Sequence, residues 1–382
     1  MKNPTIYEIA NHAGVSIASV SRVLNNLPGV SAATGRRILE SARELGYVPN
    51  GAARGLAQGT HRVIGLVFRD LDDQTSESGH ETLLYSDEVI RGAERAARAA
   101  GYAVMIVATH HSTGRDLLMS VAGKVDGLVV LARSVSESDL KVLALHGPVA
   151  LLAVGHGVKG VDDVAADNEG GSAAVTTHLA VHHGYTDIAF LSGPLASPDS
   201  RARFAGHRQA MEAVGLTRPE RPTLVGDFTE ESGARAIREL LQRPTPLPQA
   251  IVSANDQMAV GALTALSKAG LSVPNDVALT GFDDIQLASY LSPGLTTVRQ
   301  PMRQLGAECV RLVIDRLAHP RVRSTEVVLP TQLIVRGTCG CRSQLAGGLE
   351  VPPAGSLPAR GGAAGGPMSR PGEPAQEWRH AA

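Results

Sequence analysis

The stretch Thr5–Asn25, TIYEIANHAGVSIASVSRVLN, has the pattern of two short helices joined by a tight turn. Thr5 and Glu8 have the spacing of a capping box, in which each side chain accepts a hydrogen bond from the other residue's amide. Gly14 can take the left-handed conformation that ends a helix, and Ser16 can cap the next one. This stretch therefore predicts a helix-turn-helix.

A third helix is expected to begin at a Ser31 cap and to end before Gly46, so residues 1–46 are expected to form a small all-α domain. Three helices of this size enclose only a small core. The helical period turns Val20 and Val23 of the second helix toward that core and leaves its other face exposed.

The exposed face of the second helix is chemically suited to DNA. Arg22 can donate two parallel hydrogen bonds to guanine O6 and N7 in the major groove. Ile17 and Ala18 offer apolar surface to thymine methyl groups, and short hydroxyl or amide side chains can hold phosphates. The residues expected to contact DNA in this domain are Thr5, Ser16, Ile17, Ala18, Ser19, Ser21, Arg22, Asn25, Ser31 and Thr34. The alternative is a helical bundle whose polar face meets only water.

The rest of the chain divides into three zones. Residues 47–61 contain one proline and three glycines and are expected to be a linker. Residues 62–341 alternate short apolar runs with amphipathic stretches. Residues 342–382 hold eight Gly and six Pro, which predicts a disordered tail. Because the net charge of the whole chain is −1, the positive charge needed for DNA must be local to residues 1–62.

The large zone predicts an α/β domain with parallel sheets. The expected strands are Val63–Phe68, Ala103–Ala108, Gly127–Leu131, Val149–Val154, Ile188–Ser192, Thr223–Val225, Ala250–Ser253 and Val277–Thr280. The expected helices include Glu88–Ala100, Gly170–His183, Ala202–Val214, Glu230–Leu241 and Gln257–Ala269. Apolar strands that alternate with helices are typical of parallel sheets covered on both faces, and such sheets bind ligands beyond the carboxyl ends of their strands.

Several classes of protein find little support in the sequence. The phosphate-loop, dinucleotide, nucleophile-elbow and zinc-protease motifs do not occur, so we expect no enzyme and no cofactor. Cys339 and Cys341 form an isolated Cys-x-Cys motif, which lacks the two further ligands that a metal site needs, so free thiols are expected. Adjacent histidines such as His182 and His183 point in different directions, so solvated histidines and no metal are expected. Sparse cysteines and the lack of an apolar leader predict a cytoplasmic, nucleoid-associated protein.

The stretch Thr5–Asn25 resembles the signature of the lactose/galactose repressor (LacI/GalR) family. The next segment resembles that family's hinge, and the likeness extends over most of residues 4–336. It implies a DNA-binding transcriptional regulator whose hinge, residues 47–61, folds into a short helix only on operator DNA. Leu56 takes the position of a leucine that wedges between base pairs in the minor groove. By resemblance, the hinge residues that contact DNA are Asn50, Ala53, Arg54 and Leu56.

The same resemblance implies that residues 62–341 adopt the type I periplasmic-binding-protein fold, in which two parallel-sheet subdomains close over a small ligand. The chain would cross between the subdomains three times, near Gly155–Asp162, Pro293–Arg299 and Thr325–Val328. A sugar needs planar polar partners for its paired hydroxyls and an apolar surface for its C–H side. The effector contacts implied by the resemblance are Ser197, Arg203, Phe228, Asn255, Asp283 and Gln300.

The sequence departs from the family pattern in two places, and these departures limit how many of the family's effector contacts can be assigned to this chain. The segment Asp70–Gly92 is longer than the usual family version, and Leu131 and Ala153 replace positions that are often polar. The first subdomain's half of the site therefore does not carry over. Considered singly, Arg203 and Asp283 could instead form a structural ion pair.

The expected function is that of a homodimeric repressor on a pseudo-palindromic operator, controlled by a small sugar-like effector. One alternative is a corepressor-dependent regulator that senses a purine or a sugar phosphate. Another is a sugar-binding protein of the transport type, which shares the sensor fold. Deleting residues 1–60 separates the two classes, because only a regulator would lose operator binding. The tail lacks leucine heptads, so a tail-driven tetramer is not expected.

Overall fold

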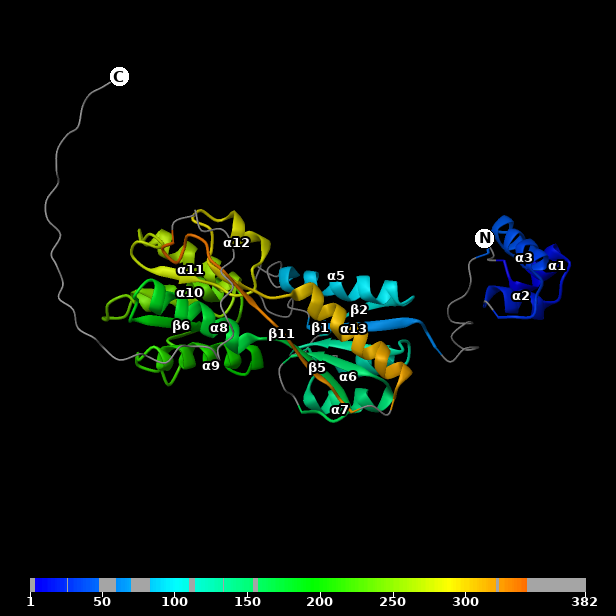
Figure 1. Cartoon of the computed structure of the whole chain (residues 1–382), viewed down its shortest axis with the longest axis horizontal. Helices are drawn as coiled ribbons and strands as arrows, with labels where there is room; N and C mark the ends of the chain where they lie inside the picture. Colours follow the sequence, from blue (N-terminus) through cyan, green and yellow to red (C-terminus); the bar gives the residue numbers. More distant parts are fainter. Residues whose placement is uncertain are drawn as a thin grey trace, which may run out of the picture. The chain divides into compact units, whose positions relative to one another are not determined.

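The computed structural model of the chain (Figure 1) describes residues 4–25, 27–47, 60–69, 83–109, 114–132, 134–153, 157–320 and 323–341. Most of the expected hinge and all of the expected tail, residues 342–382, lie outside these ranges. So do the four hinge residues expected to contact DNA, Asn50, Ala53, Arg54 and Leu56. Every helix in the described part of the chain is too short or too polar to span a lipid bilayer.

The N-terminal domain consists of three helices: α1 (Ile6–Ala13), α2 (Ile17–Leu24) and α3 (Ala32–Glu44). The capping box between Thr5 and Glu8 is present, and Gly14 ends α1 with a φ of 63°. Ser16 and Ser31 cap α2 and α3 through their hydroxyl groups. The domain's core is correspondingly small: Ile9, Ala10, Ala13, Val20, Ile38 and Ala42. The expected helix starts and stops are confirmed, because each depends on a cap only a few residues away.

The first α/β subdomain has a six-stranded parallel sheet in the order β11-β5-β4-β3-β1-β2. Its strands are β1 (Val63–Arg69), β2 (Ala103–Thr109), β3 (Gly127–Leu131), β4 (Val149–Leu152), β5 (Val161–Ala166) and β11 (Glu326–Leu329). Its helices are α5 (Leu83–Ala99), α6 (Gly114–Ala122), α7 (Glu137–His146) and α13 (Met302–Ala318). Successive strand residues face opposite layers, so Leu66 packs with α5 and α13 whereas Val67 packs with α6 and α7.

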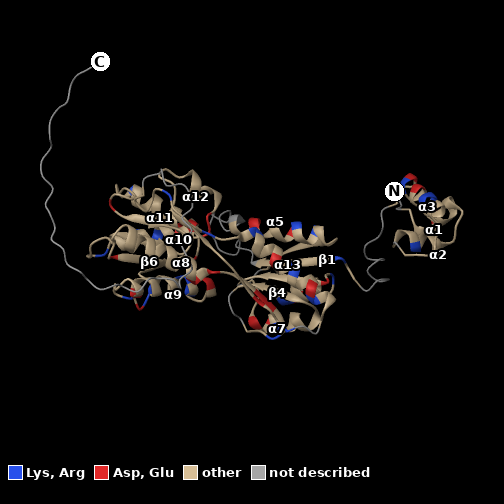
Figure 2. Cartoon of the chain, in the orientation of Figure 1, with Lys and Arg blue, Asp and Glu red and all other residues tan. Residues whose placement is uncertain are grey.

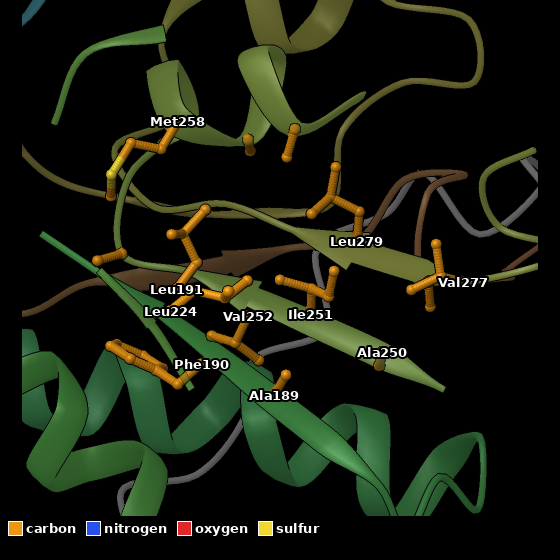
Figure 3. Close-up of a cluster of buried hydrophobic side chains, with 14 of the residues drawn as sticks. Ala189, Phe190, Leu191, Leu224, Ala250, Ile251, Val252, Met258, Val277 and Leu279 are labelled. Atoms are coloured by element: carbon orange, nitrogen blue, oxygen red, sulfur yellow. The ribbon is translucent and has the colours of Figure 1, made fainter. Parts of the chain in front are cut away.

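The second subdomain has a four-stranded parallel sheet in the order β7-β6-β8-β9. Its strands are β6 (Ile188–Ser192), β7 (Leu224–Val225), β8 (Ala250–Ser253) and β9 (Ala278–Thr280). Its helices are α8 (Asn168–Thr177), the π-helix η1 (His178–His182), α9 (Pro198–Ala213), α10 (Glu230–Leu241), α11 (Asp256–Lys268) and α12 (Gln286–Tyr290). Figure 3 shows Phe190 and Leu191 on opposite sides of this sheet, and the Phe190 ring lies 5.3 Å from that of Phe204 in α9.

All eight expected strands are present, with ends within two residues of the expected positions. Some helices begin earlier than expected. Helix α9 begins at Pro198 rather than Ala202, because Ser197 caps it and a proline suits the first helical position. Strands β10 (Thr297–Arg299) and β12 (Gln332–Ile334), which pair antiparallel, were not expected.

One of the three crossings between the subdomains lies elsewhere than expected. The expectation of a crossing at Gly155–Asp162 is wrong, because β5 pairs with β4 and keeps the chain in the first sheet until Ala166. The third crossing follows β11 directly, next to the expected Thr325–Val328. Strand β5 could not be recognised in the sequence because it contains two consecutive aspartates. In the structure, Asp162 is buried because it forms a bidentate ion pair with Arg316 of α13.

Three pairs of neighbouring helices touch through their backbones at glycines. A Cβ added at these glycines would come within 2.1 Å of a carbonyl oxygen in the facing helix: Gly306 against Val89 for α13 and α5, Gly206 against Glu169 for α9 and α8, and Gly261 against Glu230 for α11 and α10. Any larger side chain would force the paired helices apart.

Alanine is therefore expected to act in opposite directions at two helical glycines. Gly261→Ala should lower the free energy of unfolding by about 1–3 kcal/mol, because the α10–α11 pair must separate. Gly35→Ala in α3 should raise it by up to about 1 kcal/mol, because the nearest atom lies 4.0 Å away and alanine favours helix. Native-state hydrogen exchange in α3 and in α10–α11 reports each domain separately. An unchanged α10–α11 stability in Gly261→Ala would contradict this packing.

Candidate DNA-binding and effector-binding sites

Helix α2 exposes the side chains expected to read DNA. Val20 is its one buried residue, whereas Ile17 at its first position is 39% exposed. Ala18 and Arg22 are also exposed. Exposure of an apolar isoleucine side chain to water is unfavourable. Its position at the start of α2 therefore suits contact with an apolar group of a partner, such as a thymine methyl.

The hydroxyl residues cluster at helix starts. The hydroxyls of Ser16 and Ser19 lie 2.9 Å apart at the start of α2, and those of Ser31 and Thr34 lie 2.9 Å apart at the start of α3. Thr5 occupies the same position before α1. Free amides and the helix dipole favour anions at such positions, which suits phosphate contacts.

Two of the expected contacts are held by local backbone groups. Arg22 Nη1 donates to the carbonyl of Pro28 at 2.8 Å, and Asn25 Nδ2 donates to the carbonyl of Ser21 at 2.9 Å. A guanidinium has five N–H donors, so Arg22 keeps others for a base edge. Lys/Arg and Asp/Glu both occur on the N-terminal helices (Figure 2), and α2 itself carries Arg22 as its one charged residue.

A cavity of about 180 Å³ is lined by described residues of both subdomains. The second subdomain contributes Ser197, Asp199, Arg203, Asp227, Phe228, Thr229, Asn255, Gln257 and Asp283. The first subdomain contributes Phe68, Tyr85, Ser86, Leu131, Ala132, Ser134 and Leu152. Five of the six residues expected to contact the effector therefore lie together, and Gln300 is the exception.

The carboxyl ends of four parallel strands position these residues. Ser197 follows β6 and caps α9, and Asn255 follows β8 and caps α11. Phe228 follows β7, where it takes a φ of 79°, and Asp283 follows β9 with a φ of 117°. Non-glycine residues with positive φ carry backbone strain and concentrate at functional sites. The cavity lies where parallel sheets are expected to bind ligands.

Arg203 is buried, and several contacts hold its guanidinium. Its Nε donates to Asn168 Oδ1 at 2.7 Å, and its Nη1 donates to the carbonyl of Ala254 at 2.5 Å. The same Nη1 lies 3.4 Å from Asp283 Oδ1, and the guanidinium stacks 3.9 Å from the centre of the Phe282 ring. These contacts fix the planar group, so it presents a preorganised edge to a ligand.

Asp283 is the buried carboxylate of the cavity. Burial raises its pKa to about 6, although the Arg203 charge and a hydrogen bond from Gln300 favour the ionised form. Gln300 Nε2 donates to Asp283 Oδ1 at 2.5 Å. The structure thus places Gln300 beside Asp283 and away from the cavity wall, because this amide is used to hold the carboxylate.

The loop that carries Asp283 is anchored on both sides. Asp256 Oδ2 accepts from the amide of Ile285 at 2.9 Å, and a Cβ at Gly281 would lie 2.0 Å from Asp256 Oδ1. Asp284 accepts from Arg299 Nε at 2.7 Å and from Arg336 Nη2 at 2.6 Å. These long-range contacts hold the strained backbone in place.

Sequence reasoning missed much of the cavity lining. Asp199 lies one turn before Arg203 on α9, and this helical spacing was a signal that could have identified it. Asp227 and Thr229 flank Phe228 and were also available as neighbours. The first subdomain's wall, with Phe68 and Tyr85 among its residues, carried no local signal because it assembles from four separate segments.

The protein-family comparison matches both parts of the chain. The family described as bacterial regulatory proteins, lacI family, matches residues 5–50, and a periplasmic binding protein-like domain matches residues 176–339. The chain is 32% identical over 338 residues to the ribose operon repressor of Escherichia coli (strain K12), covering 87% of this chain and 99% of that protein. The chain belongs to the lacI family of bacterial regulatory proteins. It is a DNA-binding transcriptional regulator with the expected combination of a helix-turn-helix and an α/β sensor fold.

Other lacI-family proteins agree with this assignment. The chain is 30% identical over 341 residues to the HTH-type transcriptional repressor PurR of Vibrio campbellii, covering 87% of this chain and 98% of that protein. It is similar to a lac repressor dimer bound to operator and the anti-inducer ONPF, with a TM-score of 0.76, 28% identity and coverage of 88% and 99%. A CelR–cellobiose complex matches with a TM-score of 0.65, 31% identity and coverage of 88% and 100%.

Proposed function

We propose that this chain is a homodimeric repressor whose affinity for a pseudo-palindromic operator is controlled by a neutral sugar bound in the cavity between its subdomains. The observation that carries the proposal is the convergence of five expected effector contacts at the ends of four strands, in a chain whose N-terminal domain exposes one face of α2. The names of the ribose operon repressor and the CelR–cellobiose complex support a sugar. The protein acts on DNA in the cytoplasm and catalyses no reaction.

The charges of the lining favour a neutral ligand. Among the described lining residues, three carboxylates (Asp199, Asp227 and Asp283) stand against the single guanidinium of Arg203. That guanidinium already serves Asn168, Ala254 and Asp283. A phosphate would meet excess negative charge, whereas sugar hydroxyls can donate to the carboxylates and pack their C–H face on Phe228.

A purine corepressor is the second candidate. Phe68, Tyr85 and Phe228 all line the cavity and offer flat apolar surface for a base. The similarity to a repressor named PurR supports this reading as well. A purine would have to raise operator affinity if it acts as a corepressor, which separates it from an inducing sugar.

On DNA, we propose that α2 lies in the major groove, where Ile17, Ala18 and Arg22 meet base edges. Hydroxyls at the starts of the three helices hold phosphates. Leu56 opens a base step in the minor groove when the two hinges pair. The remaining proposed contacts are Thr5, Ser16, Ser19, Ser21, Asn25, Ser31, Thr34, Asn50, Ala53 and Arg54.

The proposal is tested in two stages with the full chain. An operator is selected from a random double-stranded library, and a chain lacking residues 1–60 serves as the control that should select nothing. Thermal unfolding is then measured with monosaccharides including ribose, with cellobiose, with purines and with sugar phosphates. A neutral sugar that stabilises the protein and shifts operator affinity supports the proposal. Stabilisation by purines alone, or by sugar phosphates alone, would overturn the sugar assignment.

Arg22→Ala is expected to weaken binding to the selected operator by about 1–3 kcal/mol and to relax the preference at one base pair per half-site, because a bidentate guanine contact is lost. Arg43→Ala, an exposed arginine at the end of α3, is the matched control and should change affinity little. Fluorescence anisotropy with single-base operator variants measures both effects. Equal losses on every operator variant would assign Arg22 to phosphate binding instead.

Effector affinity is expected to depend on pH through Asp283. The ionised carboxylate accepts sugar hydroxyls, and its pKa is about 6. Lowering the pH protonates it, so the effector Kd should rise about tenfold between about pH 7.5 and about pH 5. Titration calorimetry measures this change. Asp283→Asn should bind more weakly and show a flat profile over the same window, and a flat profile in the unaltered protein would contradict the role of Asp283.

A further inference from the structure

Four metal-ligating side chains meet in the second subdomain, away from the effector cavity. His178 and His183 belong to the end of the α8–η1 helix, and Cys339 and Cys341 belong to the segment after β12. The ligand atoms of all four lie within 4.8 Å of one another. The cysteine pair lacked two further ligands in the sequence, and the fold supplies them from a segment 158 residues away, counted from His183 to Cys341.

The distances among His178, His183 and Cys341 match three ligands of a tetrahedral ion. The Nε2 atoms of His178 and His183 lie 3.3 Å apart. The Cys341 sulfur lies 3.4 Å from Nε2 of His183 and 3.7 Å from Nε2 of His178. Zinc bonds of ~2.0–2.1 Å to nitrogen and ~2.3 Å to sulfur, set at tetrahedral angles, place two nitrogens about 3.3 Å apart and nitrogen and sulfur about 3.5 Å apart.

The π-helix explains why the two histidines face the same point. In an α-helix, residues five apart lie about 140° apart around the axis. In a π-turn, hydrogen bonds run between residues five apart, so the side chains of such residues lie nearer to one face than they would in an α-helix. Residues His178–His182 form such a turn, and His183 follows it directly. Short π segments are rare in proteins, and many of those that occur lie at functional sites.

The cysteine segment is shaped around the histidines. Gly340, between the two cysteines, has a φ of 105°, and a Cβ there would lie 3.4 Å from Nδ1 of His183. The Tyr185 ring stacks on His183 with centroids 5.4 Å apart, and its hydroxyl donates to the carbonyl of Cys339 at 3.3 Å. Cys339 is fully buried and Cys341 is half-buried. Such outer contacts orient metal ligands.

We propose that His178, His183, Cys339 and Cys341 bind one Zn²⁺ that clamps the end of the sensor domain to the α8–η1 helix. Four protein ligands fill a tetrahedral shell, which is the arrangement of a structural zinc site. Binding requires the cysteines as thiolates, so both S–H protons pass to solvent as the ion enters. The clamp closes a long loop through the second subdomain and favours the folded state over the unfolded chain.

The full chain, purified under reducing conditions and stripped with a chelator, is loaded with Zn²⁺ or Co²⁺ and desalted. About one ion per chain should remain, and Co²⁺ should give the strong visible bands of a tetrahedral site together with a thiolate-to-Co²⁺ charge-transfer band. Zn²⁺ should raise the thermal midpoint by ~5 °C or more. It should also protect Cys341, the half-buried cysteine, from alkylation.

Variants of the site and matched controls separate the ligands from their neighbours. Cys341→Ser and His183→Ala should lose the stoichiometric ion. His182→Ala, in the same turn, and Cys309→Ala, the remaining cysteine, should keep it. If the site variants do not fold, the Co²⁺ spectrum of the unaltered chain decides by itself. Less than about a tenth of an equivalent bound, a six-coordinate Co²⁺ spectrum without thiolate bands, or a Cys339–Cys341 disulfide that persists after reduction would each overturn the proposal.

Discussion

Replacing Arg203 with alanine is expected to weaken effector binding by about a hundredfold or more. The guanidinium, which lies in the cavity wall, orients Asp283, contacts Asn168 and stacks on the buried Phe282. Hydrogen bonds to charged groups contribute about 1.5–3 kcal/mol each, and about 1.4 kcal/mol is a tenfold change in affinity. Loss of two hydrogen bonds of this kind accounts for the hundredfold decrease in affinity. Titration calorimetry, with the sugar identified in the thermal unfolding screen, measures this decrease.

Two further variants make the Arg203 experiment specific. Arg201→Ala, an exposed arginine on the same helix, is the matched control and should bind the sugar normally. Arg203→Lys keeps the charge but loses the planar group, so it should remain far weaker than the unaltered protein. Operator binding without sugar should persist in all three. An Arg203→Ala protein that folds and responds to sugar at normal concentrations would assign Arg203 a structural role only.

Asp162→Ala is expected to lower the free energy of unfolding by about 3–5 kcal/mol, which is the typical cost of breaking a buried ion pair. The Asp162 side chain is 2% exposed, and that of Arg316 is 12% exposed. The carboxylate accepts from Arg316 Nε at 2.8 Å and from the amide of Thr325 at 2.8 Å. Its loss leaves the guanidinium charge without its balancing carboxylate and the start of β11 without its anchor.

Urea denaturation of the full chain measures the Asp162 effect. Asp315→Ala is the matched control, because Asp315 pairs with the exposed Arg311 on the same α13 helix, and exposed pairs contribute less than about 1 kcal/mol. Asp162→Asn keeps an acceptor and should lie between the two. If Asp162→Ala and Asp315→Ala cost the same, the buried pair would not hold β5 and α13 together.

The helix-turn-helix could be predicted almost completely from the sequence, because local chemistry decides it. Thr5, Gly14, Ser16 and Ser31 act within three or four residues of themselves, and each start and stop appears where expected. The eight apolar strands were equally visible from their periodicity. Five of six effector contacts also lie together, because strand-to-helix junctions collect at one edge of a parallel sheet.

What sequence reasoning missed depends on contacts between distant segments. In strand β5, Asp162 is compatible with burial because Arg316, 154 residues away, and the amide of Thr325 donate to it. Gln300 donates a hydrogen bond to the Asp283 carboxylate because β10 passes beside the loop after β9. The first subdomain's wall of the cavity combines short segments that no local pattern joins.

The sequence by itself determined the helix-turn-helix, the eight apolar strands and the family, since caps and periodicity act over a few residues. Only the tertiary structure decided which charges are buried, where the chain crosses between its sheets, and which side chains share a site. Cys339 and Cys341 are an example. The sequence predicted two free thiols, whereas in the structure a π-turn places His178 and His183 next to them. Burial and ligand geometry depend on through-space neighbours, and folding alone selects those neighbours.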